Sequence, residues 1–196
     1  MASDLKIIPV YDIFMKYNYI VPIYQRNYAW EEKQIDQLIE DIEETIDHNK
    51  ELRSEIEKLS FLKALKVYKD NPDAVVIGAD TIVVVDNKVL GKPKNEQEAN
   101  EMLHKLQNNK HTVITGCTII SSKMSETFSN MSDVYFNPMS DEEIDEYIKT
   151  NEPMDKAGAY AIQGIGSKFI HSIDGDYYSI MGFPISEVYQ RIKKYL

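Results

Sequence analysis

The sequence predicts an α/β protein with a mixed sheet and flanking helices. Two runs, AVVIGA at 74–79 and TIVVV at 81–85, are β-branched and almost wholly apolar, which is typical of strands buried on both faces. Segments with apolar residues at helical spacing alternate with further strand patterns along the chain. The chain has 196 residues, 43% of them hydrophobic, which suits one domain of ordinary size, or one domain with a small addition, and is enough for a core.

Two helical segments are predicted before the first strand. The first has its apolar stripe at Ile35, Leu38, Ile39, Ile42 and Ile46, in an otherwise acidic segment. Residues 47–50 interrupt that stripe. The second stripe consists of Leu52, Ile56, Leu59, Leu62 and Leu65, and it ends near Asn71-Pro72.

Turn and capping signals define the elements that follow the first strands. Asp86-Asn87 is a predicted turn. Asn95, with Glu98 three residues later, predicts a helix start. The buried face of that helix is predicted at Ala99, Met102, Leu103 and Leu106. The segments 111–122 and 126–136 have strand patterns, and we expect them to form a pair.

Further elements are predicted in the last third of the chain. Ser140 and Glu143 form a capping box that opens a helix over 141–150. Pro184 begins a final helix that runs to Leu196. Short strands are expected at 159–163 and 168–173, on either side of a turn GIGS.

The composition argues against several classes of function. A net charge of -10 and the lack of a Lys/Arg cluster before Lys193-Lys194 argue against a nucleic-acid partner. No stretch approaches the ~18 uninterrupted apolar residues of a membrane helix, and the first residues lack a signal-peptide pattern. We therefore expect a cytoplasmic protein without a membrane partner. The single cysteine, Cys117, lies in an apolar run, and we expect it in the core.

Three motifs could carry chemistry. Asp80 comes at the predicted end of an apolar strand, where a carboxylate is costly unless it is paired, hydrogen-bonded or metal-bound; it could also cap a turn. Gly91-Lys92-Pro93 could bring an ammonium group to an anion, or it could be a solvated loop. In the segment 155–164, small residues could let the backbone approach a ligand, and Gln163 could bind a base edge or a phosphate. The alternative there is a tight turn packed under Tyr160.

In their order and spacing, these motifs resemble the Maf family. The matching segments are LSFLKA at 59–64, GADTIVVVDNKVLGKP at 78–93, HTVITG at 111–116, EPMDKAGAYAIQGIG at 152–166 and IDGDYYSIMGFP at 173–184. The resemblance implies a fold related to the inosine triphosphate pyrophosphatases. It also implies hydrolysis of a nucleoside triphosphate to the monophosphate and pyrophosphate with a divalent cation, Mg²⁺ or Mn²⁺, and a homodimer.

The resemblance assigns catalytic roles to a carboxylate and to lysines. Asp80 matches the family's proton acceptor and a metal-side carboxylate, while Lys63 and Lys92 match lysines that face the phosphates. Such a carboxylate can activate water for attack on the α-phosphorus, while lysines and a metal neutralise charge on the leaving pyrophosphate.

The resemblance also assigns residues to substrate binding. Thr81 and Gln163 match positions linked to base choice, and these two residue types resemble the branch that acts on dTTP and UTP. Asp155 and Lys156 belong to the motif and are expected to bind substrate.

Residues 1–50 depart from this pattern. Family members open with a loop ASxSPRR that grips the triphosphate, and this sequence contains no such loop. Instead, residues 1–46 resemble the start of the ParB-like domain in GmrSD-type restriction proteins, through Pro22, Tyr24, Gln25, Arg26, Tyr28 and Trp30. We therefore expect a foreign segment at 1–50 and an N-terminally incomplete Maf-like domain at 51–196, with impaired pyrophosphatase activity. The alternatives are a catalytically inactive fusion and a restriction-associated interaction module.

Overall fold

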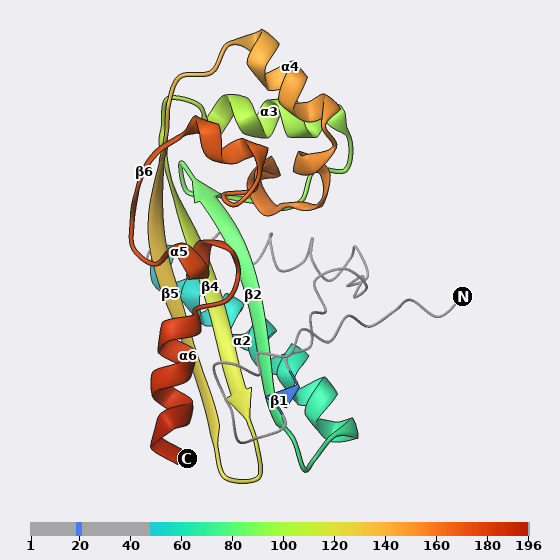
Figure 1. Ribbon diagram of the computed structural model, residues 1–196, viewed down its shortest axis with the longest axis vertical. Helices are drawn as coiled ribbons and strands as arrows, with labels where there is room; N and C mark the ends of the chain where they lie inside the picture. The colour runs from blue at the N-terminus through green and yellow to red at the C-terminus, as the bar shows by residue number, and fades with distance from the viewer. Residues whose placement is uncertain (1–18, 21–47, 196) are drawn as a thin grey trace, which may run out of the picture. The chain divides into compact units, whose positions relative to one another are not determined.

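The computed structural model describes residues 19–20 and 48–195 of the chain (Figure 1). Its strands in this part are β1 (Tyr19–Ile20), β2 (Val75–Val85), β3 (Lys88–Leu90), β4 (Lys110–Ile120), β5 (Ser125–Phe136) and β6 (Ile170–Asp174). Its α-helices are α2 (His48–Asp70), α3 (Glu96–Leu106), α4 (Asp141–Lys149), α5 (Tyr177–Ile180) and α6 (Ile185–Ile192). Short 3₁₀ helices are η2 (Glu152–Asp155), η3 (Ala157–Ala159), η4 (Ile165–Phe169) and η5 (Lys193–Tyr195). The helix predicted at 35–46 lies outside the described residues.

The strands form a mixed sheet in the order β1-β2-β4-β5-β6, with β3 paired to β2. β1 runs parallel to β2, with Tyr19 opposite Val75, whereas β3 runs antiparallel to β2 and β6 antiparallel to β5. The predicted α/β class with a mixed sheet is therefore confirmed, as is the pairing of the segments that became β4 and β5. Among the described residues, no helix has both the length and the apolar character needed to cross a membrane.

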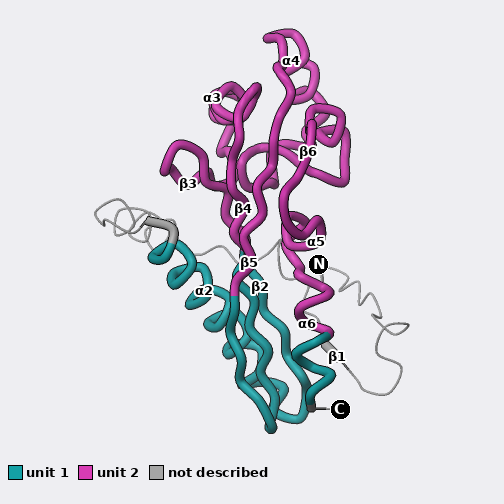
Figure 2. Tube along the Cα trace, turned by 90° about the vertical axis from the view of Figure 1, so that its left-hand side faces the viewer, with its two compact units in different colours: residues 1–80, 116–128, 190–196 teal, residues 81–115, 129–189 magenta. Residues whose placement is uncertain are grey.

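The chain divides into two compact units (Figure 2). The first unit comprises residues 1–80, 116–128 and 190–196, and the second comprises 81–115 and 129–189. The strands β2, β4 and β5 each contribute a segment to both units, and Asp80 is the last residue of β2 that belongs to the first.

In the first unit, α2 approaches β2 and β4 backbone to backbone. A Cβ on Gly78 would lie 2.6 Å from the carbonyl oxygen of Ser60, and one on Gly116 would lie 2.5 Å from that of Ile56. The buried face of α2 is accordingly Leu52, Ile56, Ser60 and Ala64, at intervals of one turn. The predicted apolar stripe is wrong at Leu62, which is 49% exposed, because Leu62 lies on the opposite side of α2 from Ser60, whose backbone approaches Gly78.

A ladder of hydroxyl groups fixes α2 to the strands of the first unit. Ser60 Oγ donates to the carbonyl of Glu57 at 2.8 Å. Its hydroxyl proton is thereby used, so Thr118 Oγ1 must donate to Ser60 at 2.8 Å, and Thr127 Oγ1 to Thr118 at 2.9 Å. Every donor of the ladder therefore has an acceptor, which favours one register of the helix on the strands. The neighbouring Cys117 is fully buried, which confirms its place in the core.

The second unit contains the larger apolar cluster. Its buried members are Val83, Val85, Leu90, Ala99, Leu103, Leu106, Val113, Val134, Phe136, Met139, Ile144, Tyr147, Ile148, Ala159, Tyr160, Ile162 and Phe169. The predicted turn at Asp86-Asn87 is confirmed, and its positive φ angles of 49° and 59° are those of a type I′ hairpin. The predicted caps of α3 by Asn95 and of α4 by the Ser140 capping box are also confirmed.

The strand predicted at 159–163 is wrong. This segment follows η3 and leads into η4, so the GIGS stretch begins a 3₁₀ helix and β6 begins only at Ile170. Positive φ angles at Gly158 (70°) and Ala159 (59°) turn the backbone here. The apolar side chains of the segment are buried against the core of the second unit, and this burial produces the pattern that resembled a strand. The final helix α6 follows Pro184 as predicted, but it ends at Ile192 and continues as η5.

Candidate functional site

Asp80 lies in the middle of β2, not at the end of a strand as predicted, because β2 runs unbroken from Val75 to Val85. Its Oδ1 is 2.8 Å from Lys63 Nζ, which α2 presents. The side chains of Asp80 and Lys63 are 25% and 26% exposed. Pairing and partial solvation thus offset the cost of burying this carboxylate. Of the residues predicted from the sequence, the structure brings Lys63 and Asp80 together within the first unit; their chemical roles stay predictions.

Thr81 belongs to a hydrogen-bond relay within the second unit. Its Oγ1 is 2.8 Å from Thr115 Oγ1 on β4, and Thr115 Oγ1 donates in turn to the carbonyl of Ser179 at 2.7 Å. A threonine hydroxyl has one proton, so Thr81 must be the donor to Thr115. Thr115 is fully buried. Sequence reasoning missed Thr115, because the motif HTVITG marks a strand without indicating which side chain bonds to a neighbour.

The short helix α5 is fixed by Asp176. Its carboxylate accepts hydrogen bonds from the backbone N–H groups of Tyr178 and Ser179, each at 3.1 Å, and from Ser179 Oγ at 2.6 Å. Asn130 Nδ2 donates to the same Ser179 hydroxyl at 3.1 Å. The segment IDGDYYSIMGFP therefore supplies a rigid acceptor for the relay that begins at Thr81.

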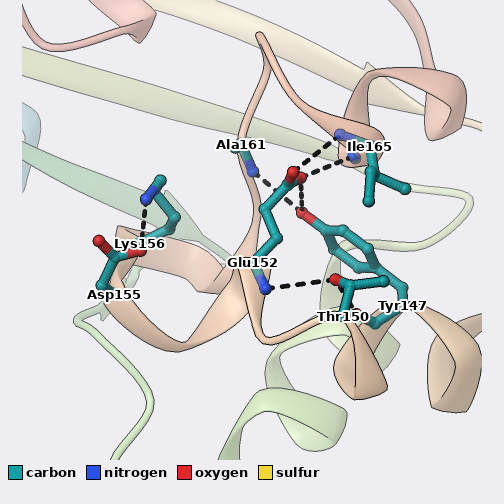
Figure 3. A network of polar contacts seen from close by, with 8 residues as sticks. Tyr147, Thr150, Glu152, Asp155, Lys156, Ala161 and Ile165 are labelled. Carbon is teal, nitrogen blue, oxygen red and sulfur yellow. Dashed lines mark hydrogen bonds and ion pairs between the residues drawn. The ribbon is translucent and has the colours of Figure 1, made fainter.

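Lys92, Asp155 and Lys156 lie on two loops of the second unit that are joined by a backbone hydrogen bond. Gly158 N donates to the carbonyl of Gly91 at 3.0 Å. Lys156 Nζ forms an ion pair with Asp155 (Figure 3). The expectation that small residues in this segment admit a ligand stays a prediction; at Gly158, a Cβ would meet Val83 Cγ1 at 2.9 Å. This glycine makes room for the protein's own core.

The loop that carries Gln163 is held by Glu152 and Tyr147 (Figure 3). The Glu152 carboxylate accepts from Ile165 N and Gly166 N, both at 2.9 Å, and from the Tyr147 hydroxyl at 2.8 Å. Tyr147 Oη in turn accepts from Ala161 N at 3.1 Å. Partial burial raises the pKa of Glu152, but these hydrogen bonds outweigh it and the net pKa lies below the ordinary value. Burial, reinforced by the bond to Glu152, raises the pKa of Tyr147.

Gln163 itself is exposed, in a turn between Ala161 and Ile165. A Cβ on the next residue, Gly164, would collide with the Glu152 carboxylate, so this glycine too is required by a protein group. Sequence reasoning missed Glu152, although it begins the segment EPMDKAGAYAIQGIG, because no local pattern distinguishes an anchoring glutamate from a solvated one.

A buried imidazole lies beside Tyr160. His111 Nε2 and the Tyr160 hydroxyl are 2.8 Å apart, and both rings pack edge-on against Phe136. His111 Nδ1 is buried and has no hydrogen-bond partner in the described part of the chain. Burial lowers the pKa of His111 to about 4, so the ring is neutral at pH 7. Tyr160 is a core residue, which agrees with the alternative of a tight turn packed under this side chain.

The described residues contain no large cluster of metal-binding side chains. No group of three or more His, Cys, Asp or Glu side chains there could hold a metal ion.

The residues that resemble a GmrSD-type domain, Pro22 to Trp30, lie outside the described part of the chain, so that resemblance stays a prediction.

Comparison with known proteins identifies the family. The family model described as "Maf-like protein" matches residues 27–195. A dTTP/UTP pyrophosphatase of Bacillus cereus (strain G9842) is 43% identical over 158 residues, which are 81% of this chain and 83% of the relative. The dTTP/UTP pyrophosphatases of Bacillus cereus (strain ATCC 10987 / NRS 248) and of Bacillus thuringiensis subsp. konkukian (strain 97-27) are 44% and 43% identical over the same share of this chain, covering 78% and 83% of their own lengths.

The matched range begins at residue 27, N-terminal of Leu59, where the resembling motifs begin. The domain boundary expected between residues 50 and 51 stays a prediction. A family model that spans most of the chain, together with relatives above 40% identity, shows that this chain belongs to the Maf family.

Proposed function

We propose that this chain hydrolyses dTTP and UTP to the nucleoside monophosphate and pyrophosphate. The observation that supports this most is the Lys63–Asp80 pair, which joins two of the segments that resemble the family, LSFLKA and GADT. Relatives named dTTP/UTP pyrophosphatase, 43% identical to this chain, support the choice of substrate. The proposal takes the roles of the individual residues from the family resemblance.

Asp80 is the proposed proton acceptor. The oxygen of a water molecule forms a bond to the α-phosphorus while the bond from that phosphorus to the bridging oxygen breaks. Pyrophosphate leaves with the bonding electrons, and the proton of the water passes to the Asp80 carboxylate. Lys63 keeps some exposure, so the phosphates of an arriving nucleotide can compete with Asp80 for its ammonium group. Lys63 and Lys92 then neutralise charge on the leaving group.

The residues present fit a divalent cation, Mg²⁺ or Mn²⁺, that arrives with the nucleotide. Mg²⁺ is usually bound through one or two carboxylates together with substrate phosphates and water. Asp80 would supply the carboxylate, and the described residues contain no larger cluster that would form a separate cage. When bound, the cation would supply further neutralisation of the pyrophosphate.

Thr81 and Gln163 are the proposed residues for base choice, and Asp155 and Lys156 are proposed to contact the substrate. Uracil and thymine both present an N3 donor between two carbonyl acceptors. A glutamine amide has one acceptor and two donors, so Gln163 can match this edge. A flipped amide could also pair with N3 and N4 of cytosine, so the expected choice against CTP rests on the named substrates of the relatives.

We expect turnover below that of a family member with the ASxSPRR loop, which this sequence lacks. Losing one bidentate arginine contact removes a few kcal/mol of transition-state stabilisation, or about 10²-fold in rate. The missing loop is expected to contact the triphosphate and not the base. We therefore expect its absence to lower the rate of hydrolysis without changing which nucleotide is preferred.

Pyrophosphate release from dTTP, UTP, CTP and 7-methyl-GTP tests the proposal. We expect dTTP and UTP to be hydrolysed in preference to the others, and Asp80→Asn to reduce their hydrolysis by at least about 10²-fold, the range expected for loss of a general base. If wild type and Asp80→Asn release pyrophosphate equally, the enzymatic proposal is wrong and the alternative of an inactive fusion stands.

A further inference from the structure

Glu152 accepts more hydrogen bonds from the protein than a solvated surface glutamate would. Three donors converge on its carboxylate: the N–H groups of Ile165 and Gly166 and the hydroxyl of Tyr147 (Figure 3). Oε2 accepts from Ile165, and Oε1 accepts from both Gly166 and Tyr147. Both carboxylate oxygens are therefore used as acceptors.

These contacts bracket Gln163. The Tyr147 hydroxyl gives its proton to Glu152 and accepts from Ala161 N, two residues before Gln163. The carboxylate itself binds the backbone two and three residues after it. The turn is thus anchored on both sides by one connected network, while the Gln163 side chain is exposed. The anchored turn fixes the position and the Cα–Cβ direction of Gln163, and the exposed side chain adopts its rotamer when the base binds.

Only a carboxylate satisfies all three donors. A glutamine at position 152 with its carbonyl oxygen in the place of Oε1 would retain Gly166 and Tyr147 but would point an NH₂ group at the N–H of Ile165. The flipped amide would retain Ile165 and lose the other two. Either orientation leaves a donor facing a donor, which is costly because the N–H loses its acceptor.

We propose that Glu152 is a positioning residue that fixes the Ala161–Gly166 turn and thereby aims Gln163 at the base of the substrate. This inference rests on the proposed function, because that proposal assigns Gln163 to the base. Glu152 does not touch the reacting atoms in this scheme; it acts through Gln163 and so affects how the base is bound, not how the phosphorus is attacked.

The test is a double-mutant cycle with Glu152→Gln and Gln163→Ala, measured as kcat and KM for UTP and CTP. We expect Glu152→Gln to raise the KM for UTP about tenfold with little change in kcat, the size of one lost hydrogen bond to the base. We expect the same substitution to add almost nothing in the Gln163→Ala background, because its effect passes through that side chain. Glu146→Gln, an equal charge change at an exposed position of α4, is the matched control and should behave as wild type.

Tyr147→Phe is the second variant, should Glu152→Gln fail to fold. It keeps the carboxylate and its two backbone donors but removes the hydroxyl, and with it the bond to Glu152 and the acceptor of Ala161 N, so the KM for UTP should again rise. If Glu152→Gln raised the KM for UTP equally in wild type and in the Gln163→Ala background, the inference would be wrong. A fall in kcat for Glu152→Gln with KM unchanged would also overturn it.

Amide hydrogen exchange separates this inference from the proposed function. In Glu152→Gln, the amide of Ile165 loses its acceptor in the side-chain orientation that keeps the other two bonds, so it should exchange at least about tenfold faster than in wild type and in Glu146→Gln. If wild type releases no pyrophosphate, the proposed function fails while this measurement still decides whether Glu152 fixes the turn. Unchanged exchange in Glu152→Gln would overturn the positioning role whatever the activity.

Discussion

Gly78→Ala tests whether the close approach of α2 to β2 sets the Lys63–Asp80 pair. The new Cβ would lie 2.6 Å from the carbonyl oxygen of Ser60 and 2.7 Å from the backbone nitrogen of Ala64, on either side of Lys63. Because real Cβ contacts are essentially never shorter than 3.0 Å and ordinary contact begins at 3.4 Å, α2 must retreat by 3.0 − 2.6 = 0.4 Å at least, and by 3.4 − 2.6 = 0.8 Å to reach ordinary contact. Both obstructing atoms belong to the backbone, and no side-chain rotation can relieve the clash.

Two magnitudes follow from that shift. Overpacking of this kind costs about 1–3 kcal/mol of unfolding free energy. A retreat of 0.8 Å would also lengthen the Lys63–Asp80 separation from 2.8 Å to as much as 3.6 Å. Because a misplacement near 1 Å can cost about 10²-fold in rate, we expect pyrophosphate release to fall by roughly tenfold to 10²-fold.

Urea unfolding of the Gly78→Ala and Gly91→Ala variants, compared with wild type, gives the unfolding free energy of each. A Cβ on Gly91 would meet no atom within 4 Å, so that variant carries the same chemical change without the clash. We expect a lower unfolding free energy for Gly78→Ala, and for Gly91→Ala a value within about 1 kcal/mol of wild type. Equal unfolding free energies for the two variants would refute the packing argument, and a destabilised Gly78→Ala with unchanged turnover would refute its link to Asp80.

Two further predictions concern buried polar groups of the second unit. Burial holds the pKa of His111 at about 4, below the 6.5 of an unfolded chain, so protons bind the unfolded state first as pH falls. The contribution of the neutral ring to the unfolding free energy is therefore complete above about pH 6.5 and is lost as the pH falls towards 4, with a loss of about 2 kcal/mol at pH 5. Urea unfolding at pH 7 and at pH 5 should show this loss in wild type and a smaller loss in His111→Gln. Thr115→Val keeps the shape of a buried side chain but removes the acceptor of Thr81 and the donor to Ser179, so unfolding free energy should fall by about 1–3 kcal/mol. A Thr115→Val protein as stable as wild type would mean that the relay contributes nothing.

The sequence correctly predicted those elements that interactions between neighbouring residues determine. The caps at Asn95 and Ser140 and the type I′ turn at Asp86-Asn87 each depend on a few adjacent residues, and all three are confirmed. The buried strand pattern of β4 also sufficed, because its residues are buried along almost the whole strand.

The predictions that failed depended on contacts from distant parts of the chain. Leu62 belonged to the predicted apolar stripe of α2, but the face that packs is the one whose backbone approaches Gly78 and Gly116, which lie far along the sequence. The turn around Gln163 looked extended because its apolar residues are buried, and the carboxylate that bends it comes from Glu152. Periodicity reports which residues are buried, whereas the backbone path there depends on a side chain outside the pattern.

Some residues of the family motifs are required by the packing of the fold, and others are not. Gly78 and Gly164 are each explained by a protein group that lies where their Cβ would be, so their presence in the motifs requires no ligand. An exposed glutamine on a tightly anchored turn has no such explanation, since packing places no demand on its side chain. A carboxylate in mid-strand, 25% exposed, is likewise not required by the sheet. We therefore expect Asp80 and Gln163 to be the motif positions at which substitutions affect chemistry most directly, whereas Glu152 and Tyr147 support the backbone on either side of Gln163.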